Sequence, residues 1–197
     1  MALAEKVLND WSITKPQRKF LLMLFTTILA LRGKVSFRNL SRYSGRPART
    51  FPRQFDQAFD FIGLNRALIE TTVPAHRPRL LAFAPCFIPK AGQHTPELAY
   101  FWHGPHGRVE KGLDVSVFSL IDLDHHTGYA LSVQQTPAPT HGRGDDESLI
   151  DAYLAHLHRL APSLHPDETH LAVDGQFAKK IWLESAPRPR LRQSENL

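Results

Sequence analysis

Asp174 is the residue of this sequence whose position best suits chemistry. It follows residues 170–173 (HLAV), a short apolar run that predicts a buried strand. An acidic side chain at the carboxyl end of a buried strand lies where α/β sheets form their active sites. The same position also suits a helix cap or a turn residue. Asp174 is therefore a candidate catalytic carboxylate, and its position alone leaves the structural alternative open.

The residues that would contact a polyanion lie in the first part of the chain, where the pattern predicts three helices. They are expected over residues 16–32, 37–44 and 50–61. Ser36 is placed to cap the second helix, and Gly45 to end it. The third helix would carry aromatic side chains at four-residue spacing on one face, namely Phe51, Phe55 and Phe59. Two short helices joined by a glycine-containing turn give the outline of a helix-turn-helix.

Basic side chains concentrate in this stretch. They are Arg38, Arg42, Arg46, Arg49 and Arg53. Long cationic side chains on such an outline suit contacts with nucleic-acid phosphates. The alternative is a small helical bundle whose arginines only solvate its surface, and the helix-turn-helix outline is too common in sequences to exclude it.

The charge of the 197 residues divides unevenly along the chain. Residues 1–80 hold 14 Lys or Arg and 5 Asp or Glu, a balance of +9, whereas the remainder holds 10 and 14, a balance of −4. A basic first part joined to an acidic second part is typical of a polyanion-binding module attached to another domain. The length allows one good-sized domain or two small ones and excludes a large multidomain protein.

The cysteine count and the apolar runs indicate a cytoplasmic protein. Cys86 is the single cysteine, so an internal disulfide and a cysteine-rich zinc site are excluded. It has no pattern of His and Asp partners, and we expect a small buried residue rather than a nucleophile. The most apolar run, residues 20–31, is shorter than the roughly 20 residues of a membrane-spanning helix. We interpret it as a core helix and expect no membrane partner.

The histidine pairs do not predict a metal site. His125 and His126 are adjacent, and His156 and His158 are two residues apart. Neither spacing places two imidazoles on one helical face, so we expect surface histidines. The sequence also lacks a glycine-rich phosphate loop, which leaves NTP hydrolysis without support.

Beyond residue 72 the pattern changes from helices to strands. Strands are expected over residues 80–83, 113–123, 128–133 and 170–173, and helices over 147–160 and 177–183. The first strand reads as a central buried strand that ends at Pro85. Residues 124–127 connect the second and third strands as a hairpin, and residues 135–146 read as a loop. This order predicts an α/β layer in which antiparallel strands precede a parallel crossover.

Four segments, taken together and in this order, resemble the IS4-like transposases of the DDE superfamily. They are SFRNLSRYSG, FIPKAGQHTPELAYFWHG, VEKGLDVSVFSLIDLD and LAVDGQFAKKIWL. The likeness runs from Trp11 to about Leu183, and its specific part is FIPK-x-G-x-x-T followed by YFW-x-G and KGL. It implies an α+β or α/β architecture: a helical, helix-turn-helix-like DNA-binding region over residues 1–72, a partial RNase H-like mixed sheet with flanking helices over 73–185, and a flexible basic tail over 186–197.

The resemblance also implies a chemistry. Such enzymes use three carboxylates to hold two Mg²⁺ or Mn²⁺ ions against a phosphodiester, because hard cations prefer oxygen ligands. Asp174 matches the second carboxylate and would be a metal ligand. Ala84 stands at the position of the first carboxylate. We expect no third carboxylate, because the sequence ends at Leu197 before the segment that would carry it. Asp122 and Asp124 are expected at the far end of the second strand, away from Ala84.

The implied partner is DNA at transposon ends, together with a second copy of the chain or an intact transposase. Side chains expected to contact DNA in the second part are Lys90, Gln93, His94, Thr95, Lys111, Lys179 and Lys180, and His103 and His106 are expected to line the same groove. Because alanine has no oxygen to bind a metal, we expect a transposase-like protein that is catalytically incomplete. The alternatives are a non-catalytic DNA-binding regulator of a transposable element and a remnant without a role.

Overall fold

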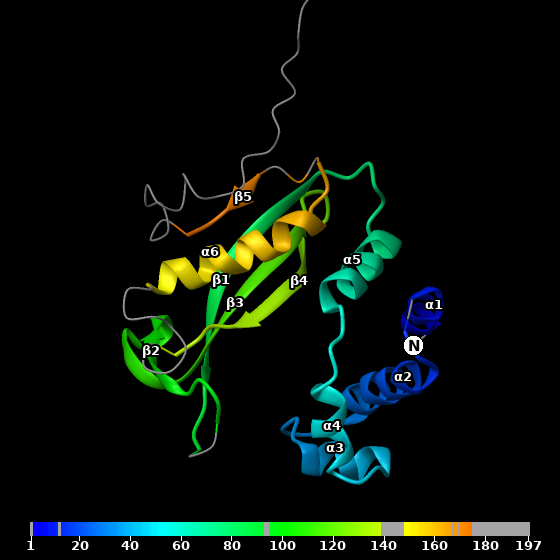
Figure 1. The fold of residues 1–197 in the computed structure, drawn as a ribbon. Helices are drawn as coiled ribbons and strands as arrows, with labels where there is room; N and C mark the ends of the chain where they lie inside the picture. Colours follow the sequence, from blue (N-terminus) through cyan, green and yellow to red (C-terminus); the bar gives the residue numbers. More distant parts are fainter. Residues whose placement is uncertain are drawn as a thin grey trace, which may run out of the picture. The chain divides into compact units, whose positions relative to one another are not determined.

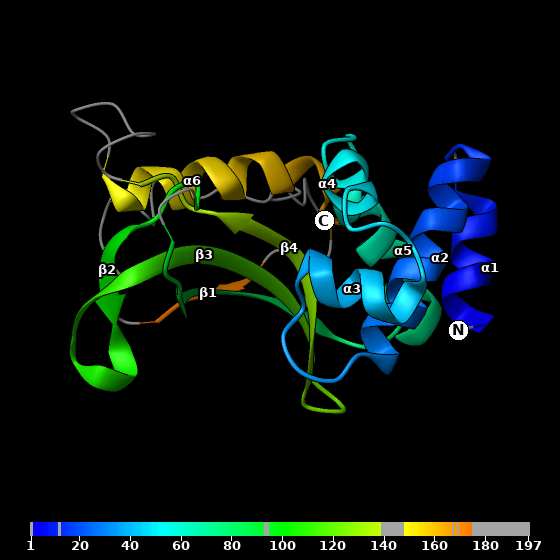
Figure 2. The same ribbon diagram turned by 90° about the horizontal axis from the view of Figure 1, so that it is seen from below.

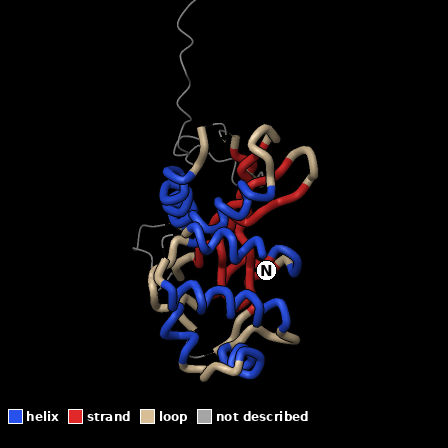
Figure 3. Tube along the Cα trace, turned by 90° about the vertical axis from the view of Figure 1, so that its right-hand side faces the viewer, coloured by secondary structure: helices blue, strands red, loops and turns tan. Residues whose placement is uncertain are grey.

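The computed structural model describes residues 2–11, 13–92, 95–138, 148–166, 168 and 170–174. The chain divides into two compact units, Met1–Thr72 and Val73–Leu197 (Figure 1). The described part of the first unit is helical, whereas the second unit combines a sheet with a helix (Figure 3). No helix among the described residues has the length and apolar character needed to cross a bilayer.

The first unit contains five helices among its described residues. They are α1 (Ala2–Asp10), α2 (Lys15–Ala30), α3 (Phe37–Ser44), α4 (Thr50–Phe55) and α5 (Phe61–Thr72). The Ser36 hydroxyl accepts a hydrogen bond from the Asn39 N–H at 3.3 Å, which caps α3 as the sequence predicts. Gly45 ends α3 at φ +67°, a left-handed conformation that glycine adopts without a steric penalty.

The third predicted helix is wrong in extent, because residues 50–61 do not form one helix. α4 ends at Phe55, and α5 begins at Phe61 after Asp60, whose carboxylate accepts a hydrogen bond from the Gly63 N–H at 2.8 Å. This side-chain cap starts a new helix and competes with continuation of α4. Phe51 and Phe59 consequently belong to two different hydrophobic clusters rather than to one face.

The second unit is built on a five-stranded mixed sheet. Its described elements are β1 (Arg79–Pro89), β2 (Ala99–His103), the 3₁₀ turn η1 (Gly104–His106), β3 (Arg108–Asp122), β4 (Thr127–Gln135), α6 (Leu149–Leu160), the 3₁₀ turn η2 (Ala161–Ser163) and β5 (Leu171–Ala172). β3 pairs antiparallel with β1, β2 and β4, and β5 pairs parallel with β1 on the other edge. The predicted order of antiparallel strands followed by a parallel crossover is confirmed over the described residues. β2 is an additional strand that the sequence did not reveal.

Helix α6 covers one face of this sheet (Figure 2). Alternate residues of β3, among them Ser116, Phe118 and Leu120, are buried on that face. The Tyr153 ring of α6 lies 5.1 Å from the Phe83 ring of β1, measured between centroids. The register places the opposite set of residues on the other face, which exposes Ile88, Tyr100, Trp102, Val109 and Val133.

β1 does not end at Pro85 as predicted but continues to Pro89. The Leu81 N–H donates to the His170 carbonyl at 3.1 Å, so odd-numbered residues of β1 direct their nitrogen toward β5. Pro85 therefore loses no hydrogen bond to β3, with which it pairs opposite Ser116. The neighbouring Cys86 lies on the face opposite α6 and is exposed, which contradicts the prediction that it is buried.

Candidate functional site

Ala84 and Asp174 come from the two parallel strands at the centre of the predicted site. The register pairs Leu81 with Leu171 and Ala82 with Ala172; Ala84 follows two residues later within β1, and Asp174 two residues after the end of β5. Both residues are exposed. Continued alternation from the Ala82–Ala172 pair would direct both side chains to the same side of the sheet. The structure thus places Asp174 just past the carboxyl end of β5 and Ala84 within the neighbouring strand β1, five residues before that strand ends.

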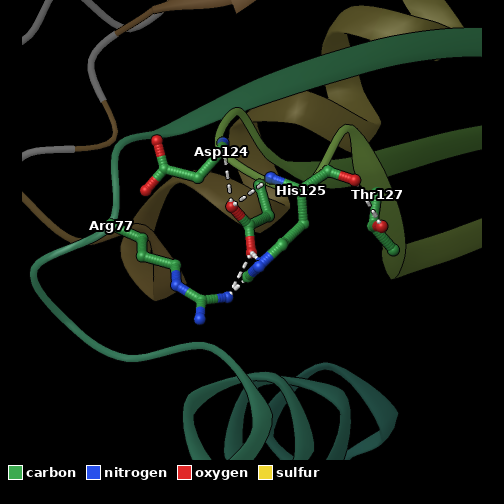
Figure 4. Close-up of polar contacts among 5 residues, drawn as sticks. Arg77, Asp124, His125 and Thr127 are labelled. Carbon is green, nitrogen blue, oxygen red and sulfur yellow. Dashed lines mark hydrogen bonds and ion pairs between the residues drawn. The ribbon is translucent and has the colours of Figure 1, made fainter.

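The other predicted carboxylates lie at the opposite end of β1. Asp122 pairs with Arg79, whereas Ala84 pairs with Val117, five positions further along each strand. As the hairpin arrangement predicts, Asp122 and Asp124 therefore lie away from Ala84. Asp122 ends β3 and Asp124 lies in the turn that joins β3 to β4, where His125 lies close to Arg77 (Figure 4).

Asp122 has a structural environment of its own. Its side chain is buried, and it accepts hydrogen bonds from the Arg77 guanidinium at 3.0 Å and from the backbone N–H of Asp124 at 3.1 Å. Burial opposes ionisation, but the hydrogen bonds from Arg77, His125 and Asp124 outweigh it and lower the pKa of Asp122 to about 2. The Asp122 carboxylate therefore holds the turn between β3 and β4 to Arg77, which precedes β1.

The described residues do not fit a two-ion magnesium site. Asp174 is a single carboxylate beside an alanine, and it belongs to no group of three metal-binding side chains among the described residues. Two Mg²⁺ ions require several oxygen ligands between them. No cleavage step can therefore be assigned to metal ions held by this set of residues.

The basic residues predicted to contact DNA are exposed where the structure describes them. Arg38 and Arg42 lie one turn apart on α3, and Arg46, Arg49 and Arg53 follow in the turn and on α4. Lys90 and Lys111 adjoin the Pro89–Gly112 pair at the carboxyl end of β1 and are exposed as well. Thr95 is half-buried. Gln93, His94, Lys179, Lys180, the predicted helix 177–183 and the predicted tail 186–197 lie outside the described residues.

Two histidines and a glutamate form a cluster that sequence reasoning missed. The Nδ1 atoms of His103 and His106 lie 2.9 Å from Oε2 and Oε1 of Glu110, respectively. The Arg108 Nε donates to Glu110 Oε1 at 2.6 Å. Hydrogen bonds from His106, His103 and Arg108 lower the pKa of Glu110 to about 2. The spacing H-x-x-H-x-x-x-E is visible in the sequence, but only the β2–β3 hairpin brings its ends together.

His156 is buried, which corrects its prediction as a surface residue, whereas His158 is exposed. The two ring nitrogens of His156 each lie 2.7 Å from a serine hydroxyl, Nδ1 from Ser116 and Nε2 from Ser132. Burial, aided by the positive charge of Arg159, lowers the pKa of His156 to about 4. The neutral ring therefore links α6 to β3 and β4.

A buried carboxylate adds to the same interface. Asp114 Oδ2 accepts hydrogen bonds from the Thr136 hydroxyl at 2.6 Å and from the Tyr153 hydroxyl at 2.9 Å. These bonds join β3, α6 and the residues that follow β4. Because hydrogen-bonded partners satisfy both His156 and Asp114, we assign them to the packing of α6 rather than to chemistry.

Three sets of residues thus stand out: the Ala84–Asp174 pair, the arginines of α3 and α4, and the His103–His106–Glu110 cluster. The first set offers a single carboxylate, and the second is an exposed cationic surface. The third combines two imidazoles with a carboxylate. A scan against protein-family models and searches of curated proteins and solved structures found no match to this chain.

Proposed function

We propose that this chain is a transposase-like DNA-binding protein whose RNase H-like core lacks the carboxylates for strand cleavage. The observation that carries the proposal is the parallel pairing of β1 with β5, which puts Ala84 and Asp174 each two residues beyond the Ala82–Ala172 pair. In the IS4-like transposases that the sequence resembles, a carboxylate is expected at both positions. The residue types, rather than the strand positions, are what this chain lacks.

The strand order supports an RNase H-like assignment. β1, β3 and β4 form an antiparallel series, and α6 then leads to β5, which returns parallel to β1. A helix in such a crossover packs on the sheet, as α6 does here. Asp174 thereby follows the carboxyl end of β5, where α/β sheets bind their substrates.

The exposed arginines support the DNA-binding part of the proposal. Two short helices, α3 and α4, carry or flank all five of them, and Phe51 on α4 packs with Leu40 on α3. Guanidinium groups on a packed helix pair can contact successive phosphates and release their counterions. Such contacts confer affinity without specifying a sequence.

The second candidate function is regulation of an intact transposase by a non-catalytic partner. The single carboxylate at the site favours it over an active enzyme, because binding to DNA ends would survive the loss of cleavage. A protein that occupies the same ends without cutting them would compete with an active copy. This candidate predicts the same DNA binding and the same absence of cleavage as the first, and adds only that the binding has a biological role. The same assays therefore address both.

The test combines DNA binding with cleavage. Fluorescence anisotropy with a labelled duplex should show an affinity that falls steeply with salt, with a slope of about −0.9 for each phosphate contact. Replacing Arg42 and Arg46 together by glutamine should reduce that slope by roughly 2. The matched control is Lys6→Gln, which removes an exposed charge from α1. A duplex affinity independent of salt would contradict the DNA-binding assignment.

Cleavage is measured on plasmid DNA with Mg²⁺ or Mn²⁺. We expect no nicking above a metal-only control, because Asp174 has no carboxylate beside it. Robust nicking that is abolished by Asp174→Ala would overturn the proposal that the core is incomplete. Nicking unaffected by Asp174→Ala would indicate a contaminating nuclease and would leave the predicted absence of activity at this site intact.

A further inference from the structure

We propose that His103, His106 and Glu110 bind a divalent transition-metal ion of the Zn²⁺ class at the β2–β3 hairpin. The three ligand atoms lie within 4.8 Å of one another. Two imidazoles and one carboxylate are a ligand set that zinc accepts, with the fourth tetrahedral position open to water. The site is separate from Asp174 and does not depend on the proposed function.

The hairpin positions the ligands before any ion binds. His103 precedes η1 and His106 ends it, and residues three apart in a 3₁₀ turn lie above one another. Their ring centroids are accordingly 4.0 Å apart. Gly107 closes the turn at φ +59°, and its N–H donates to the Gly104 carbonyl at 3.1 Å. Glycine suits this left-handed position because it has no side chain to clash.

Glu110 reaches the histidines through strand pairing. His103 pairs with Arg108 and Phe101 with Glu110, so Glu110 is the diagonal neighbour of His103 on one face of the hairpin. The Phe87 ring packs on the His103 ring, with centroids 4.7 Å apart, and Phe101 is buried. Packing on Phe87 therefore holds His103, and strand pairing places Glu110 beside it.

The separations between ligand atoms suit a small tetrahedral ion. Zinc–ligand bonds of about 2.0 Å place neighbouring ligand atoms roughly 3.3 Å apart. The two 2.9 Å contacts between Nδ1 and carboxylate oxygen need to open only slightly to reach that value. An ion would take the place of the hydrogens between these atoms, and each neutral ring would keep its proton on Nε2.

The exposure of the three side chains shows which ligands the protein holds in place and where an ion can enter. The side chains of His103 and Glu110 are 12% and 21% exposed, whereas that of His106 is 54% exposed. An ion can therefore enter past His106 and meet two ligands held by the sheet. Arg108 is the competing cation, and its side chain is 71% exposed, so it can swing away from Glu110.

The choice between metal classes follows from the donor atoms. Mg²⁺ prefers an octahedral shell of oxygens, which two imidazoles do not supply. Zn²⁺ and Co²⁺ accept nitrogen and oxygen together in a tetrahedral arrangement. The cluster should therefore bind Zn²⁺ and Co²⁺ and discriminate against Mg²⁺.

Calorimetry on the full chain with Zn²⁺, and visible absorption with Co²⁺, test the proposal. We expect one ion per chain at this site and an affinity at least about tenfold weaker in His103→Ala, His106→Ala or Glu110→Gln. His76→Ala and His158→Ala remove exposed histidines elsewhere and should leave this affinity unchanged. Arg108→Gln should strengthen binding, because it removes the cation that pairs with Glu110.

Two results would overturn the proposal. One is a folded wild-type chain that binds no Zn²⁺, and the other is a triple variant of His103, His106 and Glu110 that binds as well as the wild type. Circular dichroism verifies that each variant is folded, and the largely exposed His106 allows the test even if Glu110→Gln unfolds the hairpin. Asp174→Ala should not alter Zn²⁺ binding, which separates this outcome from the fate of the proposed function.

Discussion

Ala84 and Asp174 each lie two residues beyond the Ala82–Ala172 pair that joins the parallel strands β1 and β5. Aspartate at position 84 would place two carboxylates side by side. We expect Ala84→Asp to raise the affinity for Mg²⁺ or Mn²⁺, because two adjacent carboxylates share one cation better than a single one. Isothermal titration calorimetry measures this change.

The control for this substitution is Cys86→Asp. Position 86 is exposed and lies on the same face of β1, two residues from Ala84. It adds the same charge without facing Asp174 in the register. Equal Mg²⁺ affinity in the two variants would contradict the assignment of Ala84 to the site.

The buried His156 should make the stability of the second unit depend on pH. Its pKa falls from 6.5 to about 4 on folding, so the unfolded chain binds the proton more tightly. The stability that this group contributes is fully present above pH 6.5 and is lost as the pH falls toward 4. The loss would amount to about 3 kcal/mol. Urea unfolding between these pH values measures it.

His156→Gln should remove that dependence while it lowers stability at neutral pH, because glutamine does not titrate. His158→Gln is the matched control, since His158 is exposed on the same helix. It should keep the pH dependence of the wild type. A His156→Gln protein with the full wild-type pH dependence would show that another group is responsible.

Gly112 is placed where any larger residue would collide with its neighbours. A Cβ atom there would lie 2.5 Å from the Phe87 ring and 2.6 Å from the Ile88 carbonyl oxygen. We expect Gly112→Ala to destabilise the second unit by about 1–3 kcal/mol, because the backbone oxygen cannot move away without distorting β1. Gly104→Ala, for which no atom lies within 4 Å, should be nearly neutral. Denaturant titration compares the two, and equal stability would contradict the predicted collision.

Arg77 should control the titration of Asp122. The pKa of Asp122 is lowered from 3.8 to about 2, so its contribution to stability is present above pH 3.8 and is lost as the pH falls toward 2. Arg77→Gln removes a donor and should raise this pKa, moving acid unfolding to a higher pH. Carboxyl NMR chemical shifts measure the pKa. Arg108→Gln, at the other end of β3, should leave it unchanged, and an equal shift in both variants would exclude a local effect.

Local signals predicted the parts of the fold that depend on neighbouring residues. Helix α3 begins after Ser36 and ends at Gly45 as expected, because capping is a local interaction. The break between α4 and α5 was missed because the Asp60 cap competes with an aromatic spacing, including Phe59, that resembles one helix face. Glu110 was missed for a different reason: a strand pairing, not a sequence interval, brings it to His103.

The proximity of Ala84 and Asp174 was predictable only through the family resemblance, because their residue types carry no signal of proximity. The burial of His156 was not predictable from its spacing to His158. It depends on Ser116 and Ser132, which lie on two other elements and satisfy both ring nitrogens. Long-range polar partners of this kind are set by tertiary packing.

The direction of the β1 nitrogens has a consequence for self-association. Odd-numbered residues point their nitrogen toward the β5 edge, and both Pro85 and Pro89 are odd-numbered. A strand of another molecule that approached this edge would meet two positions without an N–H donor. Regular edge-to-edge pairing would therefore be interrupted twice within five residues, and the prolines protect this edge of the sheet from aggregation.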